Sequence, residues 1–373
     1  MRWIPFCLSL ALAALGLLTV FKAPPWVDWR LALLAGEFGH WISLMALGIL
    51  ILACSRSGGS ARGIATAVLA GAAFVLLLKP SYQAWRLGRS LSSELGAAFG
   101  PGKSSRPPFS LAAHFSPQPA AVPFETIRYA GELDLDFYRA IGRTPAPCVI
   151  VIHGGGWDNG DRRELQPFNR WLACRGYAVA AISYRLAPRS IWPAQREDVA
   201  AAVEFLRARS ASFGIDPARI VLFGRSAGGQ IAEASAYGLP GLGVRGVIAL
   251  YAPADLNFAY AFGKEDDVLK SPFLIRQFLG GTPSEVSAAY DSASAIGQVG
   301  PASPPTLLMH GELDPLVWHR QSERLNDRLG QAGVAHAFVS LPWATHAFEF
   351  NVNSPGGQLT TYAVEWFLAA ETK

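Results

Sequence analysis

Two glycine-rich motifs, each placed directly after a short apolar run, constrain this chain more than any other feature of its sequence. The motif HGGGW at residues 153–157 follows the apolar run 147–152, and GRSAG at residues 224–228 follows the run 219–223. A G-x-S-x-G pattern between a strand and a helix is typical of a sharp turn that holds a serine hydroxyl clear of the sheet. An HGGG loop can direct backbone N–H groups toward a developing oxyanion.

Together the motifs supply a nucleophile and the donors that stabilise a tetrahedral intermediate. A single G-x-S-x-G carries little weight in a chain with 37 glycines, but HGGGW about 70 residues upstream makes the signal specific. Ser226 is the predicted nucleophile, and the predicted oxyanion donors are the N–H groups of Gly155, Gly156 and Ala227. Glycine lets the loop backbone approach a substrate, and Ala227 opens a helix whose dipole adds to the field. Removing one such donor costs about 3–4 kcal/mol of transition-state stabilisation.

The pattern of apolar residues from residue 122 onward predicts alternating strands and helices. Strands are expected at 125–129, 133–139, 148–152, 178–184, 220–223, 247–251, 306–310 and 337–341, and helices at 164–175, 198–210, from 227, at 320–332 and at 360–369. Such alternation predicts an α/β fold with a doubly wound, mostly parallel sheet. Residues 257–300 are long for a connection and are expected to form a cap or lid insertion.

A serine hydroxyl needs a base to take its proton and an acid to orient that base. Asp314 lies past the strand at 306–310 and His346 past the strand at 337–341, so the chain order Ser226, Asp314, His346 is the one this motif requires. Both lie on loops at the carboxyl ends of strands, where an open α/β sheet places its site. The alternatives are Glu312 or Asp291 for the acid, and His310, His319 or His336 for the base.

The first 80 residues contain three apolar stretches, at 3–21, 31–54 and 63–78. Spans near 20 residues match a hydrocarbon core about 30 Å thick, so the sequence predicts three transmembrane helices. The first stretch has the length of a signal peptide, but residues 18–22 (LTVFK) offer no small-x-small cleavage site. Glu37 and His40, one turn apart, either mark an intramembrane functional site or anchor the helix at the interface beside Trp41.

The predicted organisation is a membrane anchor at 1–80, a helix and linker at 81–121, and a catalytic domain at 122–373. Residues 81–99 have helical spacing, and residues 100–123 are rich in Pro, Ser and Gly, which is typical of a linker. Three spans place the two ends of the anchor on opposite sides of the membrane. The positive-inside rule favours a cytoplasmic catalytic domain, since one side collects Arg2, Arg56 and Arg62 and the other Lys22, Arg30, Lys79, Arg86 and Arg89.

Composition narrows the class of function. The chain is 51% hydrophobic and only 16% charged, an apolar excess concentrated in the predicted anchor. With a net charge of +4 and no basic run interleaved with aromatics, nucleic-acid binding has no support. The four cysteines have no metal-ligand spacing and are expected to be packing residues. Nothing in the sequence specifies an oligomeric state.

These residues resemble the α/β-hydrolase esterases, in particular the hormone-sensitive-lipase-like and feruloyl-esterase-like branch with an HGGGW loop; kynurenine formamidases and isoprenylcysteine methylesterases are similar. The likeness runs from about residue 122 to the C-terminus and includes SYRLAP at 183–188 and FGIDP at 213–217. It implies an α/β-hydrolase fold with neither metal nor organic cofactor. The anchor departs from the family, whose members are mostly soluble. The supporting residues that the resemblance implies are His153, Gly154, Trp157, Gly224, Gly228 and Tyr184.

The predicted function is that of a membrane-anchored serine hydrolase that cleaves carboxylic esters. The expected substrate is a small-molecule ester, and attachment to a membrane favours a lipophilic one. An amidase or formamidase, or an acyltransferase, uses the same triad, because the pocket sets the leaving group and the acceptor. The alternative outside enzymology is a non-catalytic, membrane-tethered binding protein. Specificity is expected to lie in residues 257–300 and around Trp157 and Phe348, aromatic residues that either line an acyl or aryl pocket or only pack.

Overall fold

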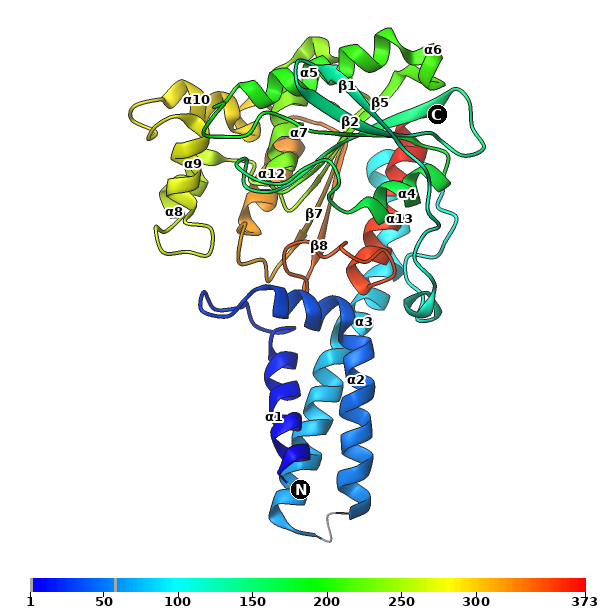
Figure 1. Cartoon of the computed structure of the whole chain (residues 1–373), viewed down its shortest axis with the longest axis vertical. Helices are drawn as coiled ribbons and strands as arrows, with labels where there is room; N and C mark the ends of the chain where they lie inside the picture. Colours follow the sequence, from blue (N-terminus) through cyan, green and yellow to red (C-terminus); the bar gives the residue numbers. More distant parts are fainter. Residues whose placement is uncertain (1–2, 57–58) are drawn as a thin grey trace.

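The computed structural model describes residues 3–56 and 59–373. An α/β domain stands on a bundle of three N-terminal helices, with the carboxyl-end loops of β7 and β8 directed toward the bundle (Figure 1). The arrangement confirms the expected α/β fold with a mostly parallel sheet and adds one feature, the direct seating of that domain on the N-terminal helices.

One sheet of eight strands forms the centre of the α/β domain, in the order β1-β2-β4-β3-β5-β6-β7-β8. β2 runs antiparallel to both its neighbours, and the pairs from β4 to β8 are parallel. The strands are β1 (Glu125–Ala130), β2 (Leu133–Tyr138), β3 (Ala146–Ile152), β4 (Ala178–Ile182), β5 (Ile215–Arg225), β6 (Gly246–Leu250), β7 (Thr306–Gly311) and β8 (His336–Leu341).

Helices cover both faces of this sheet, which explains why its central strands are apolar throughout. In β3, Ile150 and Ile152 belong to one hydrophobic cluster, and Val149 and Val151 belong to the other. A strand buried on both faces reads as a continuous apolar run rather than an alternating one. The first cluster takes side chains from α5 (Ala194–Ala208), α7 (Ala227–Gly238) and α12 (Arg320–Gln331), and the second from α4 (Gln166–Cys174) and α13 (Pro355–Glu371).

The expected insertion between β6 and β7 is helical. It contains α8 (Leu256–Phe262), α9 (Ser271–Leu279), α10 (Ser287–Ala293) and α11 (Ala295–Gln298), which lie at one side of the sheet (Figure 1). The remaining short elements are α6 (Ser210–Phe213) and the 3-10 turns η1 (Ala112–Phe115) and η2 (Pro240–Leu242).

The N-terminal helices differ in length from the three apolar stretches in which the sequence predicts transmembrane helices. α2 (Arg30–Arg56) and α3 (Ala61–Phe99) are long and apolar enough to cross a membrane, whereas α1 (Ile4–Leu17) has only 14 residues. At 1.5 Å per residue α1 is about 21 Å long, shorter than the hydrocarbon core. Two of the three expected spans therefore correspond to helices long enough to cross a membrane, whereas the chain turns after Leu17 and leaves residues 18–21 of the first stretch outside α1.

A continuous α3 joins the two parts of the molecule. The expected third span and the expected separate helix at 81–99 are one helix of 39 residues, with Pro80 in its interior. Leu91 and Leu95, near its end, are buried in the hydrophobic cluster that also contains Phe367 of α13. The same helix therefore belongs to the bundle at one end and to the core of the α/β domain at the other (Figure 1), which fixes how the domain sits on the bundle.

The predicted linker is anchored rather than free. Ser104 donates to Glu365 Oε2 (2.8 Å), and the His114 ring bonds Asn353 O (2.9 Å). Residues 100–124 have almost no regular structure, as their composition predicts, but these side-chain contacts hold them against the α/β domain. Of the residues used for the expected orientation in the membrane, Arg2 lies outside the described residues.

Candidate active site

The turn between β5 and α7 presents Ser226 at the carboxyl end of the sheet. Its backbone adopts φ 51° and ψ −122°, a sparsely populated conformation for a residue with a side chain. The Ser226 N–H donates to Leu250 O (2.9 Å), which ties the turn to β6. Gly228 must lack a side chain here, because a Cβ would lie 2.2 Å from Ile152 O. The close approach of α7 to β3 therefore requires glycine at this position of the motif.

The HGGGW loop lies across from this turn and carries two of the three N–H groups that the sequence predicts as oxyanion donors. Gly155 has φ +101° and Gly156 has φ +59°, and within the described chain neither N–H group has an acceptor. Ala227 is the first residue of α7, so its N–H has no partner within the helix. One cavity, here named the nucleophile cavity, is lined by Ser226, Ala227, Gly155 and Gly156. The residues that carry these N–H groups therefore border the same cavity as the Ser226 side chain.

The residues flanking the loop hold it in shape. Tyr184 Oη–H donates to both His153 O and Gly154 O (3.2 Å each), and the Tyr184 and His153 rings stack at 4.2 Å. Gly154 N–H donates to Glu164 Oε2 (2.7 Å). His153 is buried within this packing, away from the nucleophile cavity. The geometry gives His153 a bracing position and adds Glu164, which sequence reasoning missed because a lone loop carboxylate carries no signal.

Trp157 combines packing with a contact to the cavity. Its indole stacks on Phe278 of α9 (4.5 Å between ring centres), and Nε1–H donates to Gln230 Oε1 on α7 (2.8 Å). It also lines the cavity that contains Ser226. Phe348, by contrast, is fully buried against Tyr251 and does not line that cavity, whereas Phe350 does. Of the two roles that the sequence leaves open for Phe348, the structure therefore shows packing, and Phe350 borders the cavity instead.

Asp314 and His346 meet as the chain order predicts. The loops after β7 and β8 place His346 Nδ1 2.7 Å from Asp314 Oδ2. Asp314 also accepts the N–H groups of Leu316 (2.8 Å) and Val317 (3.0 Å). Burial opposes ionisation of Asp314, but the charges and hydrogen bonds of His346 and His310 outweigh it and hold the pKa of this carboxyl well below its usual range. An ionised acid of this kind keeps the imidazole in one tautomer.

The alternative acids and bases lie elsewhere. Glu312 accepts from Ser340 Oγ, and Asp291 accepts from Asn257 on the insertion. His310 is buried behind Asp314, where it contacts Ser322 and Val317 O. None of these lines the nucleophile cavity, nor do the other rival bases, His319 and His336.

Ser226, His346 and the oxyanion loop share a cavity of about 770 Å³. This volume lies within the range of small-molecule sites. Three sources contribute its walls: the loops of the sheet, the insertion through Val268, Leu269 and Leu274, and, unexpectedly, the start of α2. The arrangement can bind an acyl group beside an activated hydroxyl and stabilise the negative charge that develops on its oxygen.

Residues 135–329, more than half of the 373 residues, match the family model described as BD-FAE. The chain belongs to the BD-FAE family. The Esterase LipQ of Mycobacterium tuberculosis is 31% identical over 231 residues, which cover 58% of this chain and 54% of LipQ. The chain therefore spans about half the length of that relative.

Two further comparisons agree with this assignment. The probable carboxylic ester hydrolase LipM of M. tuberculosis is 27% identical over 377 residues, covering 92% of this chain and 86% of LipM. The solved structure of a bacterial heroin esterase matches with a TM-score of 0.56 and 25% identity, over 67% of this chain and 83% of that one. The BD-FAE domain is thus an α/β-hydrolase esterase of the hormone-sensitive-lipase-like branch, a carboxylic-ester hydrolase.

The N-terminal segment completes the site of this BD-FAE domain. Trp29, Arg30 and Leu33 line the nucleophile cavity, and the Trp29 ring meets the His346 ring edge-on at 6.0 Å. The Tyr251 ring also lies against the imidazole, with 4.2 Å between the ring centres and a tilted orientation. Sequence reasoning missed these contacts, because no local pattern links residue 29 to a loop more than 300 positions later.

α2 also holds the loop that carries His346. Glu37 is buried, and it accepts from Trp343 Nε1–H (3.2 Å) and from Gly356 N–H (2.8 Å). His40, one turn later, stacks on His114 at 3.9 Å. Glu37 therefore contacts Trp343 and Gly356, and His40 contacts His114 of the segment after α3, so both side chains face protein. An intramembrane functional site and an interfacial anchor both stay predictions for this pair.

We expect Glu37→Leu to loosen this loop and to lower kcat for ester hydrolysis about tenfold. The substitution leaves two buried donors without an acceptor, and each such loss costs about 1–3 kcal/mol. Hydrogen exchange of residues 343–356 in the full-length chain should show the corresponding loss of protection. Glu94→Leu is the matched control, since Glu94 is exposed on α3. Unchanged protection in Glu37→Leu would contradict the role of Glu37 in holding the loop that carries His346.

Proposed function

We propose that this chain is a membrane-anchored serine hydrolase that cleaves carboxylic esters through Ser226, His346 and Asp314. The observation that carries the proposal is the shared cavity, in which Ser226 and His346 lie beside the unpartnered N–H groups of Gly155 and Gly156. His346 takes the proton of the Ser226 hydroxyl as that oxygen attacks the ester carbonyl, and Asp314 stabilises the imidazolium that forms.

The tetrahedral oxyanion then accepts hydrogen bonds from Gly155, Gly156 and Ala227. Collapse expels the alcohol, which takes its proton from His346 and leaves an acyl-enzyme on Ser226. Water, deprotonated by His346, attacks the acyl carbonyl, and a second tetrahedral intermediate releases the carboxylic acid and restores the serine. The strained backbone of Ser226 holds the hydroxyl at the cavity throughout this cycle.

Anchoring in a membrane is the second part of the proposal. Besides the two long apolar helices, the bundle has exposed aromatic residues near both ends: Trp3 on one side, and Trp26, Trp41 and Trp85 on the side of the α/β domain. Trp is enriched at membrane interfaces. Small residues allow close packing between the helices, since a Cβ on Gly39 would lie 2.5 Å from Leu77 O and one on Gly16 would lie 2.8 Å from Leu76 Cβ.

This anchoring supports a lipophilic ester as substrate. The cavity opens where the sheet meets the bundle, and its rim includes the exposed side chains of Phe350 and Val268. An ester dissolved in the bilayer would reach this mouth without crossing water. Each CH₂ buried on the way contributes about 0.8 kcal/mol of transfer free energy.

A p-nitrophenyl ester chain-length series, hydrolysed by the full-length chain in lipid nanodiscs, tests the ester hydrolysis and the lipophilic substrate. We expect Ser226-dependent turnover that rises from acetyl to medium and long acyl chains. Turnover should also be faster when lipid is present than in buffer without a lipid phase. A preference for short, water-soluble esters with no activation by lipid would remove the lipophilic substrate. No ester turnover by the folded protein would instead favour amide or formamide hydrolysis, acyl transfer or a non-catalytic binding role.

A further inference from the structure

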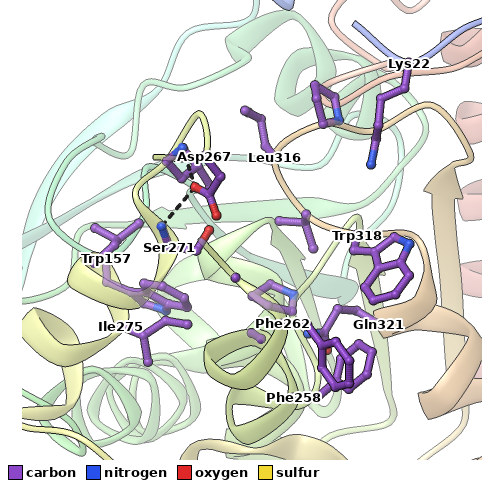
Figure 2. A pocket seen from close by; sticks show the side chains of 17 residues that line it. Lys22, Trp157, Phe258, Phe262, Asp267, Ser271, Ile275, Leu316, Trp318 and Gln321 are labelled. Atoms are coloured by element: carbon purple, nitrogen blue, oxygen red, sulfur yellow. Dashed lines mark hydrogen bonds between the residues drawn. The ribbon is translucent and has the colours of Figure 1, made fainter. Parts of the chain in front are cut away.

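A second cavity, of about 240 Å³, adjoins the nucleophile cavity. The two share lining residues from three elements: Trp157 of the HGGGW loop, Leu274 of α9, and Leu316 after β7. The far part of the second cavity is aromatic, with Phe258, Phe262 and Trp318 around it (Figure 2). A ligand held at Ser226 can therefore extend past Trp157 and Leu316 into this chamber.

One cation belongs to this chamber, and it comes from the N-terminal helices. Lys22, in the connection between α1 and α2, lines the second cavity, and Figure 2 shows its side chain extending toward the space that Leu316 and Trp318 border. The surrounding protein lowers the pKa of the Lys22 ammonium, and the nearby charge of Asp314 opposes that shift. Lys22 is still solvent-accessible, so a ligand can reach it.

The backbone around Lys22 is fixed on both sides. Thr19 is buried, and its hydroxyl donates to Leu76 O (3.0 Å), while Lys79 Nζ donates to Thr19 O (2.7 Å). Ala23 is also buried. The position of residue 22 relative to the cavity therefore depends on the packing of α1 against α3, and not on a free loop.

Lys22 differs from the other charged residues of the two cavities in having no partner within the described chain. Arg225 pairs with Glu349 (2.7 Å), and Arg30 pairs with Asp28 (3.7 Å).

The carboxylates of the two cavities have hydrogen-bond partners of their own. Asp267, in the second cavity, accepts the backbone N–H groups of Lys264, Leu269 and Ser271 (3.0 Å each). Glu164 and Asp158 also accept hydrogen bonds, from Gly154 N–H and Gln277 Nε2.

We propose that Lys22 binds an anionic group on the substrate, so that the preferred substrate is an anionic, amphiphilic ester. This rests on the proposed function, because the ester is the one that Ser226 cleaves. The apolar body of such a molecule fits the Trp157, Leu274 and Leu316 walls, and its anion lies several bonds from the scissile carbonyl, at Lys22. Lys22 is on this account a specificity-determining residue.

The anion has two chemical sources, a phospholipid headgroup or a free half-ester of a dicarboxylic acid. The soluble arm compares kcat/KM for p-nitrophenyl adipate half-ester, which is anionic, with that for p-nitrophenyl hexanoate, which has the same acyl length without charge. The lipid arm compares fatty-acid release from vesicles of phosphatidylglycerol and of phosphatidylcholine. Each arm is reported as an anionic-to-neutral ratio within one variant, so a general loss of folding cancels.

We expect Lys22→Gln to lower this ratio about tenfold in at least one arm, which is the size of a hydrogen bond to a charged group. Lys22→Arg should retain the ratio, because it keeps the charge. Lys264→Gln is the matched control, since Lys264 is exposed and lines neither cavity. A change in the soluble arm identifies a free half-ester, and a change in the lipid arm alone identifies a headgroup.

An unchanged ratio in both arms would overturn the inference and leave Lys22 as an interfacial anchor of the helix bundle. That result is distinct from failure of the proposed function, which would appear as the absence of Ser226-dependent hydrolysis of the neutral ester in the unmodified chain. Because the neutral ester is measured in every variant, each experiment reports on both questions separately.

Discussion

Ser226→Ala should reduce kcat/KM for ester hydrolysis by about 10⁵–10⁶-fold, the largest effect expected for any single substitution in this chain. Without the hydroxyl no acyl-enzyme forms, and His346 has no proton to remove. What remains is the contribution of the oxyanion donors and of substrate binding. Initial rates with a p-nitrophenyl ester, measured on the full-length chain, test this directly.

The matched control for this prediction is Ser235→Ala. Ser235 is buried on the same helix, α7, and does not line the nucleophile cavity. It should leave the rate within a few-fold of the unmodified chain. A fluorophosphonate probe should label the unmodified chain and Ser235→Ala at Ser226, and should not label Ser226→Ala. Labelling or turnover that survives in Ser226→Ala would assign the nucleophile to another residue.

Arg225→Met should lower the free energy of unfolding by about 3–5 kcal/mol, the cost of breaking a buried ion pair. Arg225 Nε lies 2.7 Å from Glu349 Oε1, and both side chains are at most 1% exposed. The guanidinium also lies over the rings of Phe168 and Phe223, at 5.1 and 4.5 Å. After the substitution, the hydroxyl of Tyr251 is the one partner that Glu349 keeps among the described residues, so its charge stays buried without compensation.

Two further variants separate this explanation from a general packing defect. Arg219→Met removes an arginine from the same strand, but Arg219 is partly exposed and pairs with Asp216 at 3.1 Å, an interaction worth about 0–1 kcal/mol. Arg225→Met combined with Glu349→Leu removes both charges and should recover most of the lost stability. Urea unfolding of the full-length chain in micelles, followed by tryptophan fluorescence, gives the comparison. Equal losses in the single and double variants would contradict the buried-charge account.

Local sequence was sufficient for the catalytic part of the fold. The strands of the sheet are apolar because helices cover both faces, so runs such as 148–152 stand out from the surrounding chain. Gly228 and Ser226 were identifiable because a close approach and a strained turn each restrict the residue types that fit. The order of Asp314 and His346 along the chain then indicated which loops would meet. The distance of 2.7 Å between His346 Nδ1 and Asp314 Oδ2 agrees with this pairing.

Hydropathy was less informative about the N-terminal helices. It marks which residues avoid water, but it does not distinguish burial in lipid from burial against protein. Residues 81–99 therefore looked like a separate helix, although α3 is continuous and its Leu91 and Leu95 pack in the α/β core. Hydropathy also gave no sign that the Glu37 carboxylate accepts hydrogen bonds from Trp343, in the loop before His346, and from Gly356, at the start of α13.

The sequence by itself determined the fold class, the tight turn at Ser226 and the glycine-rich loop at 153–157, because each depends on residues close together in the chain. Only the tertiary structure decided that the start of α2 forms a wall of the site, that Trp29 covers His346, and that Lys22 reaches the adjoining cavity. These contacts join segments hundreds of residues apart. They arise from the seating of one helix bundle on the carboxyl edge of a sheet, and no periodicity or motif along the chain encodes that geometry.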